Sequence, residues 1–261
     1  MKQITNIQEV RLLRKNLAGH FKLGFVPTMG ALHEGHVSLI NESVRANDRT
    51  ILSIFVNPTQ FNNPKDLQSY PSTIEKDLEI ARDAKADFVF LPSYSDLYKD
   101  KFEYQIHETK LSKELCGAGR PGHFTGVLTV VMKLLNLVAP DRAYFGLKDF
   151  QQYELVKGMC EAFFLNVEIC AMETIRDAKG LAVSSRNRLL DYESKKLASH
   201  FNKALYLDET DEAVSNILKE LGFSVNYVET REGRRFGSVT ISSNKNEVRL
   251  IDNVNLERPR E

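Results

Sequence analysis

The amino-acid sequence predicts an α/β protein in which a doubly wound parallel sheet is followed by a smaller C-terminal α+β domain with a short antiparallel sheet. From about residue 22 to 173, short apolar runs alternate with runs of helical periodicity, which is typical of βαβ units and a parallel sheet. After residue 175, two helical segments precede three short strands joined by polar turns, a pattern that favours antiparallel pairing. We therefore expect two domains, residues 1–175 and 176–261.

The strands of the first domain are short and apolar. The run TILSIFV at 50–56 is nearly continuous, which is typical of a strand buried on both faces. Apolar residues at helical spacing predict the intervening helices, and Ala139 and Pro140 end the third of them. We expect strands at residues 22–28, 50–56, 87–92, 142–146 and 166–173. We expect helices at residues 34–47, 71–85, 123–138 and 149–164.

The second domain has a different pattern of apolar and polar residues from the first. Its first part has the periodicity of helices, and its last part has short β-rich runs bounded by polar residues. We expect helices at residues 192–206 and 210–221, then strands at 223–230, 237–243 and 247–253.

Composition limits the classes of function. Lys plus Arg and Asp plus Glu both total 35, so the net charge is zero, and binding of nucleic acid by bulk charge is not expected. The longest apolar-rich window, residues 127–138, is interrupted by polar residues, and the first residues lack the apolar run of a secretory signal, so no membrane association is expected. Cys116, Cys160 and Cys170 contain no C-x-x-C pair, which favours a reducing, cytoplasmic compartment.

Three short motifs each lack an element that their apparent function requires. GAGRPG at 117–122 has the spacing of a dinucleotide-binding turn, but the polar stretch TKLSKELC precedes it where a strand is needed. GALHEGHV at 30–37 has the glycine spacing of a P-loop without its Lys and Ser/Thr. HEGH at 33–36 spaces its histidines by three residues, whereas a zinc protease needs four. These comparisons argue against a dehydrogenase, a P-loop NTPase and a metalloprotease.

The segment PTMGALHEGH at 27–36 is a stronger candidate. It lies between the first predicted strand and the first predicted helix, at the sheet edge where doubly wound folds bind ligands. The helix N-terminus favours an anion. His33 and His36 are two of only six histidines, and at this spacing they can face one side and donate hydrogen bonds to phosphate oxygens. The alternative is a glycine turn with two surface histidines.

PTMGALHEGH is similar to the H-x-G-H signature of the nucleotidyltransferase superfamily that includes class I aminoacyl-tRNA synthetases. The flanking sequence narrows this resemblance to the pantoate–β-alanine ligase (pantothenate synthetase) family, which implies a Rossmann-like first domain. The blocks that carry it are SIFVNPTQF (53–61), DLQSYPST (66–73), GRPGHFTGVLTVVMKLLNLV (119–138), PDRAYFGLKDFQQ (140–152), GLAVSSRNRLL (180–190) and RLIDN (249–253).

The resemblance implies an AMP-forming ligase of pantothenate and coenzyme A biosynthesis. Pantoate carboxylate would attack the α-phosphorus of ATP, releasing pyrophosphate, and the β-alanine amine would then attack the pantoyl adenylate and release AMP. Such a reaction needs positioning and charge stabilisation. One alternative is another small-molecule adenylyltransferase of the superfamily, against which the SSRNR segment at 184–188 speaks. The other is a non-catalytic nucleotide-binding protein. A homodimer is also implied.

The same resemblance implies the site residues. His36, His33, Lys148 and Arg186 would stabilise charge on the phosphates as catalytic groups. The second domain would close over the nucleotide as a lid. The nucleotide would be bound by Met29, Gly30, Ala31, Leu32, His33, Glu34, Gly35, His36, Gly146, Leu147, Lys148, Asp149, Ile175, Val183, Ser184, Ser185 and Arg186.

Amide side chains would bind pantoate. Gln60, Gln152 and Asn57 are implied in this role, which suits a group that can both donate and accept. Arg120 is a weaker candidate, on the side of the nucleotide together with Ile175 and Val183. Magnesium is implied by the ATP chemistry, with phosphates as its main ligands; Asp77 is a candidate contact, although a solvated helix carboxylate is its simpler interpretation.

Two positions depart from the family's usual pattern. Leu147 stands where the family has Glu in a G-E-K-D motif, so no polar side-chain role is expected there. Val183 replaces the more usual Leu or Met.

Overall fold

The chain is described by a computed structural model that covers residues 1–243 and 246–257. It divides into two compact units. The first comprises Met1–Leu147 and Gln151–Met172, and the second comprises Lys148–Phe150 and Glu173–Glu261. The sequence placed the division at 175/176 and assigned no residue before it to the second domain. Residues 258–261 of that predicted domain lie outside the described residues.

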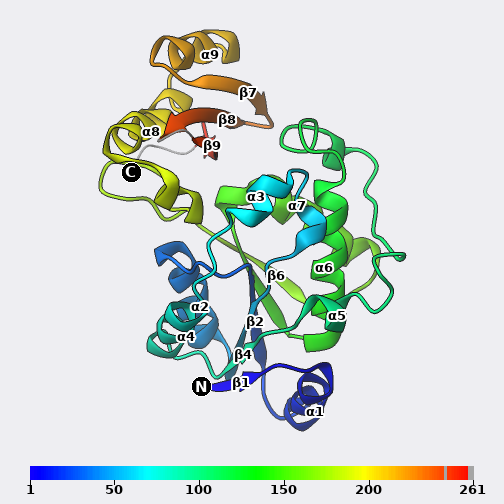
Figure 1. The fold of residues 1–261 in the computed structure, drawn as a ribbon. Coiled ribbons are helices and arrows are strands. Elements are labelled where there is room, and N and C mark those ends of the chain that lie inside the picture. Colours follow the sequence, from blue (N-terminus) through cyan, green and yellow to red (C-terminus); the bar gives the residue numbers. More distant parts are fainter. Residues whose placement is uncertain (244–245, 258–261) are drawn as a thin grey trace. The chain divides into compact units, whose positions relative to one another are not determined.

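The first unit is built on a six-stranded parallel sheet with the strand order β1-β4-β3-β2-β5-β6 (Figure 1). Its strands are β1 Lys2–Ile4, β2 Leu23–Thr28, β3 Arg49–Ile54, β4 Phe88–Phe90, β5 Arg142–Gly146 and β6 Glu168–Met172. The chain runs outward from β2 to β3 and β4, then returns to the other side of β2 to form β5 and β6. The carboxyl ends of β2 and β5, at Thr28 and Gly146, therefore flank the switch point where such sheets bind ligands.

Helices cover both faces of this sheet. Figure 1 shows α2 and α4 on one side and α1, α5 and α6 on the other, which explains why β2 and β3 are apolar on both faces. The helices are α1 Ile7–Leu17, α2 Glu34–Ala46, α3 Pro64–Gln68, α4 Ile74–Asp83, α5 Tyr94–Leu97, α6 His123–Val138 and α7 Phe150–Ala162. Three-residue 3-10 turns are η1 Pro58–Gln60, η2 Leu111–Lys113 and η3 Leu147–Asp149.

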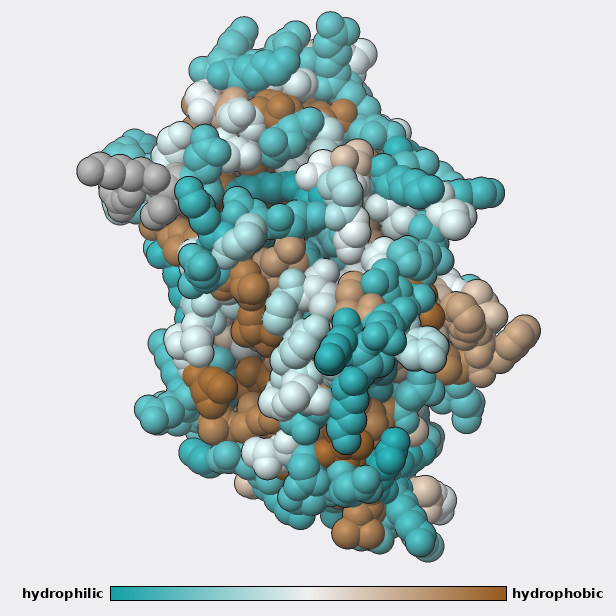
Figure 2. Space-filling model, turned by 45° about the vertical axis from the view of Figure 1, so that its right-hand side comes forward, coloured by the Kyte–Doolittle hydropathy of each residue, from teal (hydrophilic) through white to brown (hydrophobic). Residues whose placement is uncertain are grey.

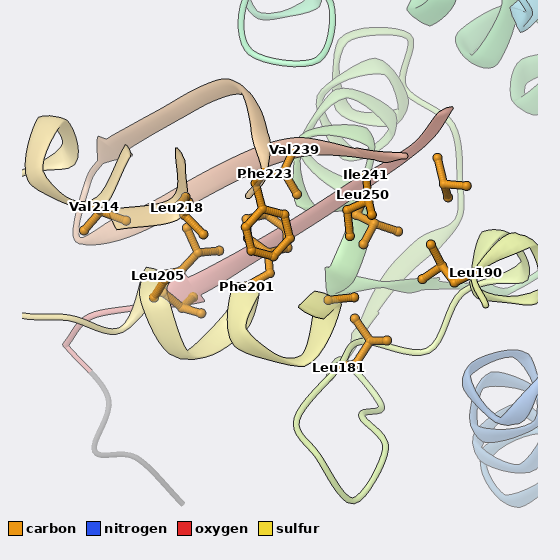
Figure 3. Packing of buried hydrophobic residues seen from close by; sticks show 14 residues of the cluster. Leu181, Leu190, Phe201, Leu205, Val214, Leu218, Phe223, Val239, Ile241 and Leu250 are labelled. Carbon is orange, nitrogen blue, oxygen red and sulfur yellow. The ribbon is translucent and has the colours of Figure 1, made fainter. Parts of the chain in front are cut away.

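The second unit contains a three-stranded antiparallel sheet packed against two helices. Phe201 and Leu205 of α8 and Val214 and Leu218 of α9 meet Val239 and its neighbours on the sheet (Figure 3). Apolar burial of this kind is the main stabilising contribution to a small domain. The described elements are η4 Ser185–Leu189, α8 Tyr192–Leu205, α9 Asp211–Glu220, β7 Ser224–Arg231, β8 Arg234–Ser243 and β9 Asn246–Asn255.

The predicted fold class is confirmed, with a parallel sheet followed by a smaller antiparallel one. Two elements before residue 22 were not predicted: α1, and β1, a three-residue strand that pairs with β4 and is too short to show a period. The stretch before GAGRPG is the 3-10 turn η2, so no strand precedes that motif.

The face of the molecule drawn in Figure 2 is largely hydrophilic, with hydrophobic side chains in scattered patches. Within residues 1–243 and 246–257, no helix has the length and apolar character needed to cross a bilayer.

Candidate active site

The turn between β2 and α2 is organised by a buried carboxylate. Asp77 of α4 is 1% exposed; its Oδ2 accepts the backbone N–H of Ala31 at 2.8 Å and its Oδ1 accepts that of Leu32 at 2.8 Å. Thr73 Oγ1 donates to Oδ1 at 3.1 Å. The interpretation of Asp77 as a solvated helix carboxylate is therefore wrong, because both oxygens are occupied by donors of the turn that follows β2.

The backbone of this turn is unusual. Gly30 has φ +78° and Ala31 has φ +51°, and a non-glycine residue in the left-handed region is strained. A Cβ atom at Gly30 would lie 3.0 Å from Asp77 Oδ2, so glycine permits both the conformation and the close approach of the carboxylate. The hydrogen bonds that the Asp77 carboxylate accepts from Ala31 and Leu32 offset the backbone strain at Ala31.

His33 and His36 lie together at the start of α2. His33 is the N-cap residue, and its backbone N–H donates to His36 Nδ1 at 3.3 Å. The two ring centroids are 4.0 Å apart. A Cβ atom at Gly35 would lie 3.0 Å from His33 Cε1, so the glycine leaves room for this ring. The N-terminus of α2 thus combines two imidazoles with the positive end of the helix dipole, an arrangement suited to an anion.

The loop after β3 places two amide side chains side by side. Asn57 is 1% exposed and Gln60, in η1, is 8% exposed. Asn57 Nδ2 donates to Gln60 Oε1 at 3.0 Å and to the carbonyl oxygen of Gly126 at 3.1 Å. A Cβ atom at Gly126 would lie 2.4 Å from the Thr59 carbonyl oxygen, so α6 can pack against η1 only because this residue is glycine.

The side chains of His123 and Arg120 both contact the main-chain carbonyl group of Gln60. Its carbonyl oxygen lies 2.8 Å from His123 Nδ1 and accepts a longer bond, 3.4 Å, from Arg120. His123 Nε2 is 2.9 Å from the Arg120 guanidinium. A carbonyl only accepts and a guanidinium only donates, so the His123 imidazole is protonated on Nδ1 and accepts on Nε2. Arg120 therefore contacts the predicted amide loop through His123 as well as directly.

Gln152 lies in the first turn of α7 and is half-buried. Its neighbour Gln151 is buried and has a different role. Gln151 accepts the backbone N–H of Cys116 at 3.1 Å and donates to the carbonyl oxygens of Leu111 and Glu114 at 2.7 and 2.8 Å. Gln151 thus anchors the 111–116 segment, whereas the family motif indicates Gln152 for substrate binding.

In the second unit, the predicted nucleotide-binding segment forms a tight hairpin-like loop. The Val183 N–H donates to the Ile175 carbonyl oxygen at 2.9 Å, which pairs these two predicted residues through their backbones. Ser184 is the N-cap of η4, and its Oγ accepts the backbone N–H of Arg186 at 3.3 Å. Ser184, Ser185 and Arg186 therefore lie at the start of one short helical turn.

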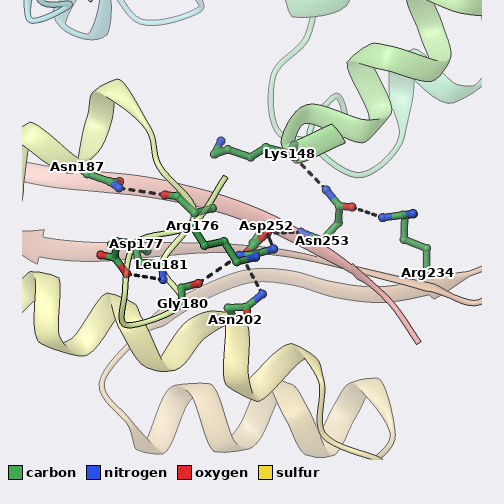
Figure 4. A network of polar contacts seen from close by, with 11 residues as sticks. Lys148, Arg176, Asp177, Gly180, Leu181, Asn187, Asn202, Arg234, Asp252 and Asn253 are labelled. Carbon is green, nitrogen blue, oxygen red and sulfur yellow. Dashed lines mark hydrogen bonds and ion pairs between the residues drawn. The ribbon is translucent and has the colours of Figure 1, made fainter. Parts of the chain in front are cut away.

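A buried ion pair anchors this loop to β9. The Arg176 guanidinium donates to both oxygens of Asp252 at 2.6 and 2.9 Å (Figure 4). Asn202 adds a bond to the same carboxylate at 3.2 Å. Burial disfavours the charge on Arg176, but the bonds and charge of Asp252 outweigh it and raise the pKa of Arg176. The pair fixes the start of the 175–186 segment.

Lys148 belongs to the same unit. Asn253 Nδ2 donates to the Lys148 carbonyl oxygen at 3.0 Å and Asn253 Oδ1 accepts from Arg234 at 2.6 Å (Figure 4). The Arg234 guanidinium lies 4.1 Å from the Phe150 ring centroid. Asp149, which is exposed, has a carboxylate 3.8 Å from Lys148 Nζ. These contacts tie residues 148–150 to β8 and β9.

A pocket in the second unit brings several predicted residues together. Lys148, Ser184 and Arg186 line it, and Arg249 of β9 adds a further cationic residue. The other lining residues are Leu181, Ala182, Asn187, Phe201, Leu250, Ile251 and Asp252. Cationic and hydroxyl groups around one pocket suit a phosphate group.

No group of three or more His, Cys, Asp or Glu side chains that could hold a metal ion occurs in the described part of the chain. The Asp77 oxygens both accept backbone N–H groups.

The structure brings the predicted residues together within each unit: His33 with His36, Asn57 with Gln60, and Lys148 with Ser184 and Arg186. Sequence reasoning assigned no role to His123 or Tyr98 and missed the organising role of Asp77. A signal for Asp77 exists, because it lies four residues before the buried Ala81 on the same face of α4. Nothing local marks Tyr98, whose partner Asn57 is 41 residues away.

Comparison with known proteins gives one consistent family. A family model described as pantoate-beta-alanine ligase matches residues 2–255. A pantothenate synthetase of Bdellovibrio bacteriovorus is 50% identical over 90% of this chain and 92% of its own. One of Legionella pneumophila (strain Corby) is 46% identical over 95% of this chain and 97% of its own.

Solved structures of the same family are similar to this chain over nearly its whole length. A pantoate-beta-alanine ligase from Francisella tularensis, complexed with beta-gamma ATP and beta-alanine, superimposes with a TM-score of 0.92 and 40% identity, covering 99% of both chains. A pantothenate synthetase of Thermus thermophilus gives a TM-score of 0.87 at 32% identity, covering 98% of this chain and 99% of its own.

Proposed function

The chain belongs to the pantoate-β-alanine ligase family and is an ATP-dependent ligase that forms the amide bond of pantothenate, and we propose which of its residues carry out the reaction. The family inferred from the sequence motifs is thereby confirmed. The reaction joins (R)-pantoate to β-alanine through a pantoyl adenylate and releases pyrophosphate and AMP. The observation that carries the residue assignment is the pair of imidazoles at the N-terminus of α2, held on a turn that Asp77 fixes.

His33 and His36 act on the phosphates in the first step. When the pantoate carboxylate attacks the α-phosphorus, negative charge grows on the phosphoryl oxygens and on the departing pyrophosphate. Imidazole N–H groups and the positive end of the α2 dipole stabilise this charge without moving. The turn from Met29 to His36 and the residues Gly146 and Leu147 after β5 approach the nucleotide through backbone atoms.

The second unit supplies the remaining nucleotide contacts. Lys148 and Arg186 bind phosphate oxygens as cations, and Ser184 and Ser185 donate hydroxyl hydrogen bonds. Asp149 binds the ribose, while Ile175 and Val183 contact the nucleotide through their backbones. Support comes from the pocket that Lys148, Ser184 and Arg186 share. In this proposal residues 176–261 form a lid domain over the ATP site.

Amide groups bind pantoate. Gln60 and Gln152 hold its oxygen atoms. Asn57, for which the resemblance also implied a pantoate contact, holds Gln60 in this proposal because its own donors and acceptor are bonded within the protein. No covalent intermediate on the enzyme is required: the pantoate oxygen bonds to phosphorus in the first step, and the C–O bond of the adenylate breaks when the amine attacks. Burial raises the pKa of Cys160 and of Cys170 to about 11, so these two cysteines are thiols rather than nucleophilic thiolates at neutral pH.

Magnesium enters as part of the substrate, as a complex with ATP whose phosphate oxygens are its ligands. We propose in addition that the enzyme works in the cytoplasm, where its three cysteines stay reduced.

We propose in addition that the enzyme is a homodimer. The aromatic side chains Phe163 and Phe164, just after α7, are 55% and 93% exposed, and β6 is an edge strand of the sheet. An exposed edge with apolar neighbours is a common pairing surface. Phe164→Ser should shift the mass measured by light scattering from dimer to monomer; a monomeric wild-type protein would contradict the proposal.

The activity is tested by incubating the enzyme with MgATP, D-pantoate and β-alanine and omitting each in turn. We expect pantothenate, AMP and pyrophosphate in equal amounts from the complete mixture. AMP formation that does not depend on pantoate would contradict the assignment. A product that keeps the nucleotide would indicate a plain adenylyltransferase.

A further inference from the structure

The Asn57 side chain is held by four hydrogen bonds. Its Nδ2 donates to Gln60 Oε1 and to the Gly126 carbonyl oxygen at 3.0 and 3.1 Å. Its Oδ1 accepts from the Tyr98 hydroxyl and from Thr59 Oγ1, both at 2.9 Å. A primary amide has two N–H donors and an oxygen with two lone pairs. These bonds therefore use its whole hydrogen-bonding capacity.

The orientation of Asn57 determines that of Gln60. Gly126 offers a carbonyl oxygen, which can only accept, so the amino end of Asn57 points toward α6. The same amino group meets Gln60, and its partner there must be the carbonyl end of the Gln60 amide. Gln60 consequently turns its NH2 group, with two donors, away from Asn57.

Tyr98 is the buried donor at the other end of this network. It follows α5, is 2% exposed, and has the Tyr94 ring stacked 4.9 Å away. Lys133 Nζ lies 4.7 Å from its ring centroid and forms an ion pair with Asp100 at 2.5 Å. Burial raises the pKa of Tyr98 to about 12. The side chain therefore keeps its O–H, and with it a donor to Asn57, throughout the neutral range.

We propose that Tyr98 is a positioning residue for the acid substrate: its hydroxyl holds Asn57, and Asn57 holds Gln60 with the amino group directed toward acceptor oxygens. The inference rests on the proposed role of Gln60 in binding pantoate. Its chemical consequence is selectivity. An NH2 group binds carboxylate or hydroxyl oxygens and repels an ammonium group, so Gln60 recognises pantoate and not the amine of β-alanine.

The first test is Tyr98→Phe, which removes one hydroxyl and keeps the ring. We expect the KM for pantoate to rise about three- to tenfold, the size of one uncharged hydrogen bond. The KM values for ATP and β-alanine should each change by less than about twofold, which is smaller than the effect of losing one hydrogen bond. The matched control is Tyr94→Phe, the same chemical change on the stacked and exposed neighbour, which should leave all three KM values unchanged.

A double-mutant cycle separates positioning from a general structural effect. If Tyr98 acts through Gln60, then Tyr98→Phe has no further effect on the pantoate KM in a Gln60→Ala background. Additive effects of the two changes would overturn the inference, as would an equal rise in all three KM values for Tyr98→Phe alone. If Gln60→Ala itself leaves the pantoate KM unchanged, the proposed role of Gln60 fails, which is a different result.

Thermal unfolding of each variant is recorded beside the kinetics. Should Tyr98→Phe not fold, Thr59→Val carries the same test, because Thr59 donates to the same oxygen of Asn57 at 2.9 Å. It too should raise the pantoate KM selectively and lose that effect in the Gln60→Ala background. An unchanged pantoate KM in a folded Thr59→Val protein would contradict the proposed network.

Discussion

The Asp77 carboxylate accepts the backbone N–H of Ala31 at 2.8 Å across 46 residues of sequence. Ala31 has a left-handed backbone conformation, and its neighbour Leu32 bonds to the other oxygen of the same carboxylate. A side chain from α4 therefore fixes the turn that carries the two imidazoles. The conformation of the turn after β2 therefore depends on a residue outside its own motif.

Asp77→Asn should loosen this turn. An asparagine has one carbonyl oxygen, so its amino group would face a backbone N–H, and leaving a buried donor unsatisfied costs about 1–3 kcal/mol. We expect the free energy of unfolding to fall by that amount and the KM for ATP to rise. Asp83→Asn on the exposed face of α4 is the control. Equal effects at both positions, or none at Asp77, would refute the proposed role.

Gly126→Ala should disturb the packing of α6 on η1. The added methyl group would lie 2.4 Å from the Thr59 carbonyl oxygen, and the backbone shift should cost about 1–3 kcal/mol in unfolding free energy. The Asn57–Gly126 bond should weaken, raising the pantoate KM. A Cβ atom at Gly158 of α7 would meet no described atom within 4 Å, so Gly158→Ala should stabilise the helix by about 0.5–1 kcal/mol. Chemical denaturation of both variants makes the comparison.

Asp252→Ala should destabilise the second unit. It would leave the largely buried Arg176 guanidinium without its carboxylate, and breaking a buried pair costs about 3–5 kcal/mol. The half-exposed pair of Arg231 and Glu229, at 2.5 Å, is the control, because Glu229→Ala should cost at most about 1 kcal/mol. Denaturation curves would show the difference. Similar losses at the two positions would mean that Asp252 does not anchor the 175–186 segment.

His36→Ala and Lys148→Ala should each slow adenylate formation by about 10² or more, the usual effect of losing an electrostatic stabiliser. Pyrophosphate release in a single turnover, without β-alanine, isolates this step. His200→Ala, an exposed histidine of α8, should react at the wild-type rate. Near-normal single-turnover rates for the first two variants would remove His36 and Lys148 from the mechanism.

Helices and strands with a clear local pattern of apolar residues could be predicted well from the sequence. The strand 50–56 and the helix 123–138 correspond closely to β3 and α6, because buried runs and capping residues are local signals. The motif that contains His33 and His36 is also a local signal, and the role of these residues in the reaction stays a prediction. Contacts between distant segments could not: the bonds of Asp77 to Ala31 and of Tyr98 to Asn57 join residues whose sequence neighbourhoods reveal nothing about the partner.

The distinction between Gln151 and Gln152 illustrates the same limit. Adjacent glutamines on a helix point in different directions, and Gln151 is buried against the 111–116 segment. The motif alone indicated Gln152 for substrate. Which glutamine is structural depends on the packing of η2, which has no periodic signal of its own.

The adenylate mechanism is tested most directly by isotope transfer. With pantoate labelled by 18O in both carboxylate oxygens, attack on the α-phosphorus makes one labelled oxygen the bridge between carbon and phosphorus. When the β-alanine amine breaks the C–O bond, that oxygen leaves with AMP. Mass spectrometry should therefore find one 18O in AMP, one in pantothenate and none in pyrophosphate. Unlabelled AMP, or label in pyrophosphate or inorganic phosphate, would contradict the mechanism.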